Sequence, residues 1–90
     1  MSRSTNNKWF VYIAKARTGR LYVGMSSDPT ERIIEHNNGS GAYFARLQGP
    51  FTLVYQSLPF ATKSDAAKRE KQLKGWTQEK KKKLISGDWV

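Results

Sequence analysis

The chain has 90 residues, 38% of them hydrophobic and 12% aromatic, which suits one small globular domain with a single modest core. It has no cysteine and one histidine, so a disulfide framework, a thiolate zinc site, a cysteine nucleophile and a multi-histidine metal site are excluded. Lysine and arginine number 16 against 7 acidic residues, and the formal net charge of +9 favours polyanionic partners, nucleic acid first among them.

The polar start of the chain has no apolar core behind it, and no run of residues is long enough to span a bilayer. We therefore expect neither a signal peptide nor a membrane anchor, and we expect a cytoplasmic location. Residues 9–86 are predicted to form one domain, between a polar N-terminal tail at 1–8 and a short C-terminal tail at 87–90.

Two short runs rich in Val, Ile, Tyr and Phe, Trp9 to Ala14 and Leu21 to Gly24, predict an antiparallel hairpin. The turn between them ends in Gly19, which favours a three-residue loop. Such a loop places Tyr12 and Tyr22 on one face of the sheet, whereas a two-residue loop or a bulge would change that register. Simple cross-strand packing is the alternative explanation for both tyrosines.

A short helix is predicted after the hairpin. Asp28 is its expected N-cap, Pro29 occupies the first helical position, and Asn38-Gly39 is the expected stop. The segment that follows reads as a loop with Tyr43 and Phe44 as anchors.

A third strand and two further helices complete the predicted domain. The run from Phe51 to Tyr55 alternates like a half-buried strand. Thr62, with an acid three residues later, is expected to cap a helix over Ser64 to Lys74, and Thr77 is expected to cap a last helix ending near Ile85. This order predicts an α+β fold, a small three-stranded antiparallel sheet flanked by three helices.

Three polar residues stand at positions that invite a chemical role. Arg32 and His36 are four residues apart, so a helix would place them side by side as a phosphate clamp or as two solvated polar residues. Glu70 shares a helical stripe with Ala66 and Leu73. A carboxylate on such a stripe is costly unless it is paired, so Glu70 is either a metal ligand or the partner of an inward-reaching Arg or Lys.

Several separated motifs together resemble one family. The pattern "FVY" followed by "YVG", an arginine in the next helix and a glutamate in a later helix is similar to the GIY-YIG nuclease superfamily. More narrowly, "VYI…LYVG…DPTERIIEHNNGSGAYFAR…P…LVY…SDAAKREKQLKGW" resembles its small single-domain members, relatives of the incision subunit of bacterial excision repair and of structure-specific junction endonucleases. The resemblance runs from about Trp9 to Ile85.

The resemblance implies a site with one metal ion, Mg²⁺ or Mn²⁺, held by Glu70. The catalytic residues that it implies are Tyr12, Tyr22, Arg32, His36 and Glu70, with Gly24 as the motif glycine. Two departures stand out: Phe10 replaces the first glycine of the motif, and the late asparagine of some members has no counterpart after Glu70.

The implied function is a metal-dependent endonuclease that hydrolyses DNA phosphodiester bonds, selects DNA by structure, and serves repair or recombination. Expected substrates are branched, nicked or single-stranded DNA, and sequence specificity would require a protein partner or a homodimer. The alternatives are a non-catalytic nucleic-acid-binding module on the same fold and a partner-docking domain. Basic residues expected to contact DNA are Lys15, Arg17, Arg20, Arg46, Lys68, Lys71 and Lys74.

The implied chemistry makes demands on the tyrosines. Tyr12 or Tyr22 would orient or deprotonate the attacking water, and an unperturbed tyrosine has a pKa of about 10. A tyrosine base therefore needs nearby positive charge to lower its pKa. Arg32, the metal ion, or a lysine such as Lys15 or Lys74 is expected to supply that charge.

Overall fold

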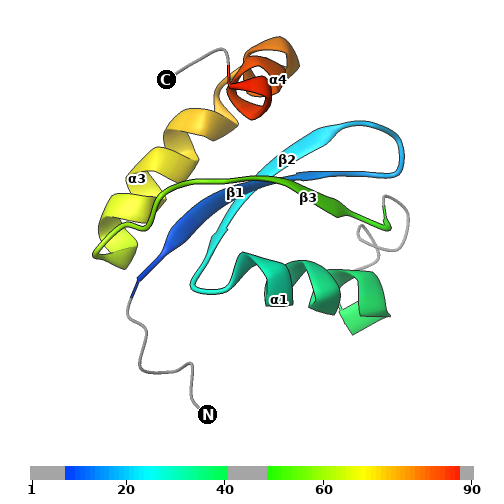
Figure 1. The fold of residues 1–90 in the computed structure, drawn as a ribbon, viewed down its shortest axis with the longest axis horizontal. Coiled ribbons are helices and arrows are strands. Elements are labelled where there is room, and N and C mark those ends of the chain that lie inside the picture. Colours follow the sequence, from blue (N-terminus) through cyan, green and yellow to red (C-terminus); the bar gives the residue numbers. More distant parts are fainter. Residues whose placement is uncertain (1–7, 41–48, 88–90) are drawn as a thin grey trace.

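A computed structural model describes residues 8–40 and 49–87 of the chain. One antiparallel sheet has the strand order β2-β1-β3, and it consists of β1 (Phe10–Lys15), β2 (Leu21–Ser26) and β3 (Thr52–Gln56) (Figure 1). The helical elements are α1 (Pro29–Glu35), the π-helix η2 (His36–Ser40), α3 (Lys63–Lys74) and α4 (Gln78–Ser86). The predicted α+β fold is confirmed, and the π-helix is an addition to it.

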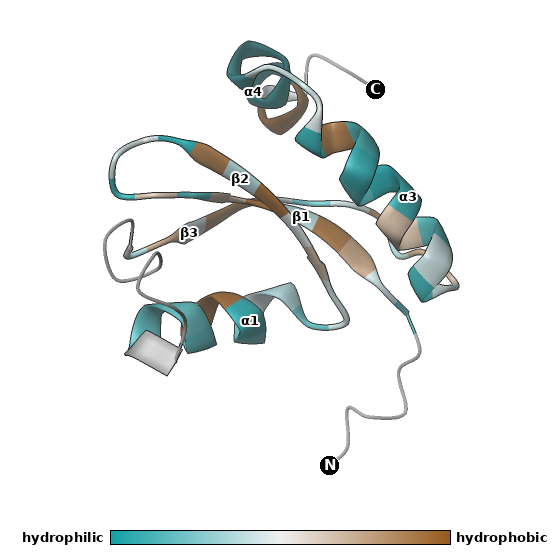
Figure 2. Ribbon diagram, turned by 180° about the vertical axis from the view of Figure 1, so that it is seen from behind, coloured by the Kyte–Doolittle hydropathy of each residue, from teal (hydrophilic) through white to brown (hydrophobic). Residues whose placement is uncertain are grey.

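The sheet separates two layers of helices. Figure 1 shows α1 on one side of the sheet and α3 with α4 on the other. Alternate residues of each strand face opposite sides, so each face has a core of its own. The core under α3 and α4 contains Val11, Ile13, Leu21, Ala66, Leu73 and Leu84, and the core beside α1 contains Tyr12, Ala14, Ala16, Ile33 and Phe51. In Figure 2 the hydrophobic strand residues accordingly lie at the centre of the molecule.

The hairpin turn has the predicted length. Its three-residue loop is closed by Ala16, whose backbone N–H donates to the carbonyl of Arg20 at 2.8 Å. The N–H of Gly19 donates to the carbonyl of Ala16 at 2.8 Å, and Gly19 has a φ of +95°. Only glycine adopts this backbone conformation without a steric penalty, which is why the turn has this sequence.

The loop length fixes the register of the two tyrosines. Tyr12 lies opposite Gly24, and Tyr22 lies opposite Ala14. Because Tyr12 and Ala14 are two residues apart on β1, both tyrosines share the sheet face that α1 covers. The prediction of a shared face is confirmed.

Short-range capping starts all three α-helices where the sequence predicts. The side chain of Asp28 accepts from the Glu31 N–H at 3.2 Å, and the Thr62 hydroxyl accepts from the Asp65 N–H at 3.1 Å. Thr77 caps α4 in the same way, at 3.1 Å from the Lys80 nitrogen. Each cap satisfies a backbone donor that has no partner inside the helix.

The end of the first helix differs from the prediction. Helix α1 stops at Glu35, and the backbone continues as η2 to Ser40, whereas the sequence placed a simple stop at Asn38-Gly39. Asn37 within η2 bonds to the backbone of Phe51 twice: its amide nitrogen lies 2.9 Å from the carbonyl oxygen, and its amide oxygen lies 2.7 Å from the backbone nitrogen. This pair ties the end of the first helical segment to the start of β3.

A second side-chain amide ties α4 to the sheet. Leu21 donates its backbone N–H to the Gln78 side-chain oxygen at 2.9 Å, and the Gln78 amide donates to the Leu21 carbonyl at 3.2 Å. Gln78 thus pairs with the outer edge of β2 as a neighbouring strand would. None of the helices in residues 8–40 and 49–87 has the length and apolar character needed to cross a membrane.

Candidate active site

The side chain of Tyr12 lies across the backbone of the edge strand β2. Its residue is only 7% exposed, and its ring passes directly over Gly24. A Cβ atom at Gly24 would stand 2.5 Å from the phenol oxygen and 2.6 Å from the ring carbon that carries it. Any larger residue would therefore displace the ring, and the glycine of the "YVG" motif is what lets the phenol reach the edge of the sheet.

Two charged residues from opposite sides of the sheet act on this phenol. The charge and hydrogen-bonding capacity of Arg32 in α1 lower the pKa of the phenol, and the charge of Glu70 in α3 raises it. The hairpin and both helices thus place Arg32 and Glu70 within electrostatic reach of Tyr12.

Burial decides the protonation state of Tyr12. Loss of hydration raises the pKa of its phenol above the ordinary value of 10.0, and the Glu70 charge raises it further. The charge and hydrogen bond of Arg32 lower this pKa, but they do not outweigh burial. Arg32 thus lowers the pKa of this tyrosine, as expected, while burial raises it by more in the protein without a metal ion. Tyr12 is a neutral hydrogen-bonding group at neutral pH.

Glu70 lies on the same inward-facing stripe of α3 as Ala66 and Leu73, as the sequence predicts. Its side chain is 20% exposed, between the fully buried Ala66 and Leu73. The Lys74 amine lies 3.2 Å from one of its carboxylate oxygens, so the ion pair expected as one alternative is formed. Lys74 is itself 58% exposed, and an ion pair with so exposed a lysine contributes little stability. A metal ion at Glu70 would have to displace the Lys74 amine from this carboxylate.

The donor set at Glu70 fits a magnesium ion with few protein ligands. Within residues 8–40 and 49–87, no three His, Asp or Glu side chains gather into a metal-binding cluster. Mg²⁺ usually retains several waters and needs only one or two carboxylates together with substrate phosphate. A single half-buried carboxylate meets that requirement, whereas a two-metal site would need more acids.

Arg32 and His36 serve different parts of the site. Arg32 is half exposed and also approaches Glu35, with 3.9 Å between their charged atoms. His36 lies at the start of η2 and packs its ring against Phe51, with 6.1 Å between ring centroids. The structure therefore brings Arg32 to the Tyr12 phenol and His36 to the neighbouring cavity.

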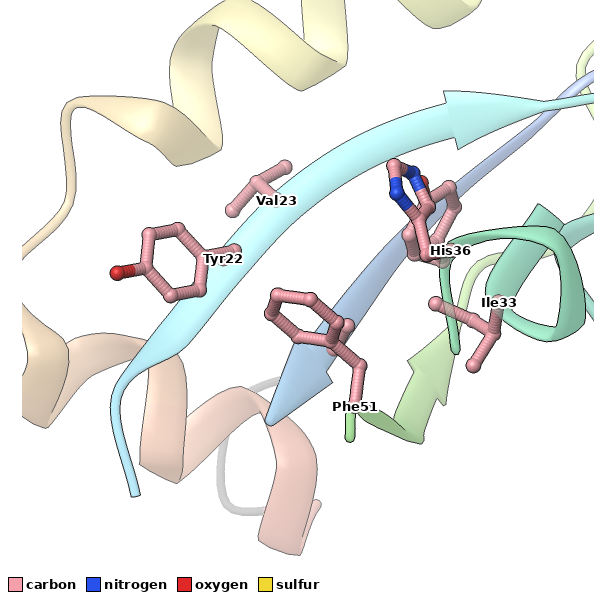
Figure 3. A pocket seen from close by; sticks show the side chains of 7 residues that line it. Tyr22, Val23, Ile33, His36 and Phe51 are labelled. Carbon is pink, nitrogen blue, oxygen red and sulfur yellow. The ribbon is translucent and has the colours of Figure 1, made fainter. Parts of the chain in front are cut away.

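A cavity of about 210 Å³ lies beside Tyr12 on the α1 side of the sheet (Figure 3). Tyr22 and Phe51 meet edge to face on its wall, with 6.0 Å between ring centroids and 84° between ring planes. The residues that line it are Tyr12, Ala14, Tyr22, Val23, Ile33, His36 and Phe51. Phe51 and Ala14 were not predicted as site residues, and their only sequence signal was their place in predicted strands.

The basic residues predicted to contact DNA are distributed over the hairpin and α3. Lys15, Arg17 and Arg20 lie exposed around the hairpin turn. The Arg20 guanidinium lies 5.7 Å from the centre of the Tyr22 ring, which places it at the cavity as a cation–π partner. Lys68 and Lys71 are exposed on α3. Tyr43, Phe44 and Arg46 lie outside the described residues.

Comparisons with known proteins show the family to which the chain belongs. The family model described as the GIY-YIG catalytic domain matches residues 8–83. A UPF0213 protein of Staphylococcus saprophyticus is 48% identical over 80 residues, covering 89% of this chain and 96% of the relative, and one of Staphylococcus epidermidis is 46% identical over 79 residues, covering 88% and 95%. The solution NMR structure of a UPF0213 protein from Bacillus halodurans superposes with a TM-score of 0.55 at 35% identity, covering 88% of this chain and 83% of that one. The chain thus belongs to the GIY-YIG family and carries its catalytic domain in the small UPF0213 form.

Proposed function

We propose that this protein is a metal-dependent endonuclease that hydrolyses DNA phosphodiester bonds. The observation that carries the proposal is that Arg32 and Glu70 both act electrostatically on the Tyr12 phenol, in a chain that carries a GIY-YIG catalytic domain. A neutral phenol, a guanidinium and a carboxylate within electrostatic reach of one another are the groups that phosphodiester hydrolysis requires for orienting water, offsetting phosphate charge and holding a cation.

Each residue has a distinct role in the proposed reaction. Glu70 would hold Mg²⁺ or Mn²⁺, whose chemistry when bound is to polarise a phosphoryl oxygen and stabilise the leaving 3′ oxygen. Arg32 donates hydrogen bonds to the phosphate oxygens as negative charge grows on them. Tyr12, held neutral by burial, orients the attacking water through its hydroxyl. When the metal ion binds to Glu70, the Lys74 amine leaves this carboxylate and contacts a neighbouring phosphate of the DNA.

We propose that the substrate is selected by its structure. A single small domain has little surface for reading base edges, and its exposed basic residues contact phosphates of any sequence. This favours branched, nicked or single-stranded DNA and a role in repair or recombination. One observation favours the alternative of a non-catalytic binding module: the Lys74 amine already occupies the Glu70 carboxylate.

A cleavage panel separates these two functions. Labelled branched, nicked, single-stranded and plain duplex DNAs are incubated with the protein in the presence of Mg²⁺, in the presence of Mn²⁺, and with chelator. The nuclease cleaves branched, nicked or single-stranded DNA faster than plain duplex, and only with a metal ion. Retention of every DNA in a binding assay, with no cleavage under either metal, would instead identify the protein as a binding module.

A further inference from the structure

We infer that the cavity beside Tyr12 holds an unpaired nucleobase adjacent to the cleaved phosphate, so that the enzyme cuts where a nucleotide is unpaired or can be extruded. This inference rests on the proposed nuclease function and adds a substrate class to it. The inference concerns the residues that line the cavity, and the proposed phosphate chemistry at Arg32 and Glu70 gives no role to the cavity itself.

The chemistry of the walls favours a base over a phosphate. Of the described residues that line the cavity, none is Lys or Arg, and Ala14 and Ile33 contribute aliphatic side chains on the α1 face of the sheet. Aromatic rings of Tyr22, Phe51 and His36 surround the same space (Figure 3). Nucleobases stack on aromatic side chains irrespective of sequence, whereas a phosphate among these apolar walls would lose its hydration. The Arg20 guanidinium lies over the Tyr22 ring, 5.7 Å from its centre, and is not part of the lining.

The volume of the cavity lies between that of a water site and that of a pocket for a drug-sized ligand. Its volume of about 210 Å³ is several times the roughly 30 Å³ that a water molecule occupies in the liquid. It is smaller than the pockets of about 300–1,000 Å³ that hold drug-sized ligands. Ala14 creates this space, because a small side chain of the central strand lies opposite Tyr22, whose ring forms part of the wall.

Tyr12 connects the cavity to the phosphate site. Its side chain lines the cavity, and its phenol interacts electrostatically with Arg32. Ile33, the residue after Arg32, lines the cavity as well. A phosphate bound to Arg32 therefore has the cavity beside it, at the place where a base attached to the same stretch of backbone must go.

A base in a regular duplex cannot enter this space. It must first leave the stack, and the energy required is lowest where the base is mismatched, damaged or single-stranded. Selection for an unpaired nucleotide thus follows from the cavity without any contact that reads a base sequence. His36, which is half-buried at the cavity, has ring nitrogens able to bond to the edge of whichever base enters.

The first test uses a DNA that lacks the base and a protein variant whose cavity is filled. Cleavage rates are measured on one branched DNA and on the same DNA with abasic sugars at the nucleotides flanking the mapped cut. The wild type should cleave the intact DNA at least about tenfold faster, since base–aromatic stacking contributes strongly to binding. Ala14→Leu, which fills the cavity, should lose that preference. Ala67→Leu, the same change at an exposed position of α3, should keep it.

Binding gives a second readout that needs no cleavage. A single-stranded oligonucleotide with one 2-aminopurine is titrated with the wild type, Ala14→Leu and Ala67→Leu without metal. The wild type and Ala67→Leu should change its fluorescence, and Ala14→Leu should not. Phe51→Leu, which removes one ring of the wall, replaces Ala14→Leu if the filled variant does not fold.

The outcomes separate the two proposals. Cleavage that ignores abasic sugars, or a preference and fluorescence change that survive in Ala14→Leu, would overturn the base-binding cavity while leaving the nuclease intact. Absence of all cleavage, with the fluorescence change lost only on filling the cavity, would overturn the nuclease and leave the base-binding site standing.

Discussion

At the residue scale, the absence of a side chain at Gly24 determines where the Tyr12 phenol lies. Tyr12 occupies the space that a Cβ atom of Gly24 would need, and there it lies within electrostatic reach of Arg32 and Glu70. Glycine in a strand usually weakens it, because it contributes no packing and loses more backbone entropy. At Gly24 the neighbouring ring covers the bare backbone, so the glycine serves the site.

Replacing Gly24 with alanine should disturb both stability and activity. Forcing the Tyr12 ring aside is an overpacking defect of about 1–3 kcal/mol. Thermal unfolding should shift downward by roughly 4–8 °C for each kcal/mol in a domain of this size. Gly75→Ala is the matched control, because a Cβ there would meet nothing closer than 3.5 Å. Adding Tyr12→Leu should relieve part of the Gly24→Ala defect, and equal melting temperatures for wild type and Gly24→Ala would disprove the packing argument.

The raised pKa of Tyr12 makes a prediction about pH. The neutral phenol persists from acidic pH up to and beyond 10.0, and it is lost only as the pH rises through its raised pKa. Tyr12→Phe should therefore slow cleavage by about 10²-fold, by a factor that stays constant from neutral pH to about pH 10. The measurement is the ratio of wild-type to Tyr12→Phe rates across that range.

Tyr22→Phe provides the comparison for that ratio. Its ring would still line the cavity, so its loss of rate should be smaller than that of Tyr12→Phe. A wild-type advantage over Tyr12→Phe that grows about tenfold per pH unit would show that an ionised Tyr12 acts as the base.

At the element scale, helices are fastened to the sheet by side-chain amides as well as by apolar packing. Gln78 pairs with both backbone groups of Leu21 on the edge strand. Asn37 does the same to Phe51 at the start of β3. Each amide satisfies a donor and an acceptor that no strand pairs, and each fastens a helical segment to the sheet.

Removing the amide of Gln78 should loosen α4 from β2. Gln78→Ala leaves two backbone groups of the buried Leu21 without their partner, which costs about 1–3 kcal/mol of folding free energy. Urea unfolding should show a lower midpoint with an unchanged slope. Gln72→Ala is the control, since Gln72 bonds to Arg69 at the surface of α3, and its effect should stay within about 0.5 kcal/mol. Equal midpoints for the two variants would contradict a structural role for the Gln78 pair.

Local interactions explain which elements the sequence could predict. Asp28, Thr62 and Thr77 cap helices through donors three residues away, so short motifs reveal them. Gln78 lies 57 residues from Leu21 along the chain, and Asn37 lies 14 from Phe51, so neither amide pair has a local signature. The π-helical continuation after Glu35 was missed for the same reason, because Asn37 is held by a distant strand.

The candidate site was predictable to a similar degree. The length of the hairpin turn alone predicts that Tyr12 and Tyr22 lie on the same face of the sheet, as the register shows. The grouping of Tyr12 with Arg32 and Glu70 came from the family resemblance, since no periodicity joins a strand to two separate helices. The net pKa of the phenol and the cavity depend on burial by several elements at once, which a sequence pattern does not specify.

At the scale of the whole molecule, the positive charge of the protein governs how it binds DNA. The net charge of +9 on 90 residues attracts phosphates, and exposed cations lie both at the hairpin turn and along α3. If about four phosphates are contacted on a duplex, the logarithm of the binding constant should fall against that of the salt concentration with a slope of about −3.6. Fluorescence anisotropy at several salt concentrations measures it, and binding that does not depend on salt would rule out the electrostatic mode.

The most direct test of the proposed nuclease compares two glutamates. Glu70→Gln keeps the volume of the side chain and removes the charge that would hold the metal, so Mg²⁺-dependent cleavage of branched DNA should fall by at least about 10²-fold while the protein stays folded. Glu79→Gln, the same change at an exposed position of α4, should cleave at the wild-type rate. Mg²⁺-dependent cleavage by Glu70→Gln at the rate of Glu79→Gln would contradict a catalytic role for Glu70 and for the site built around it.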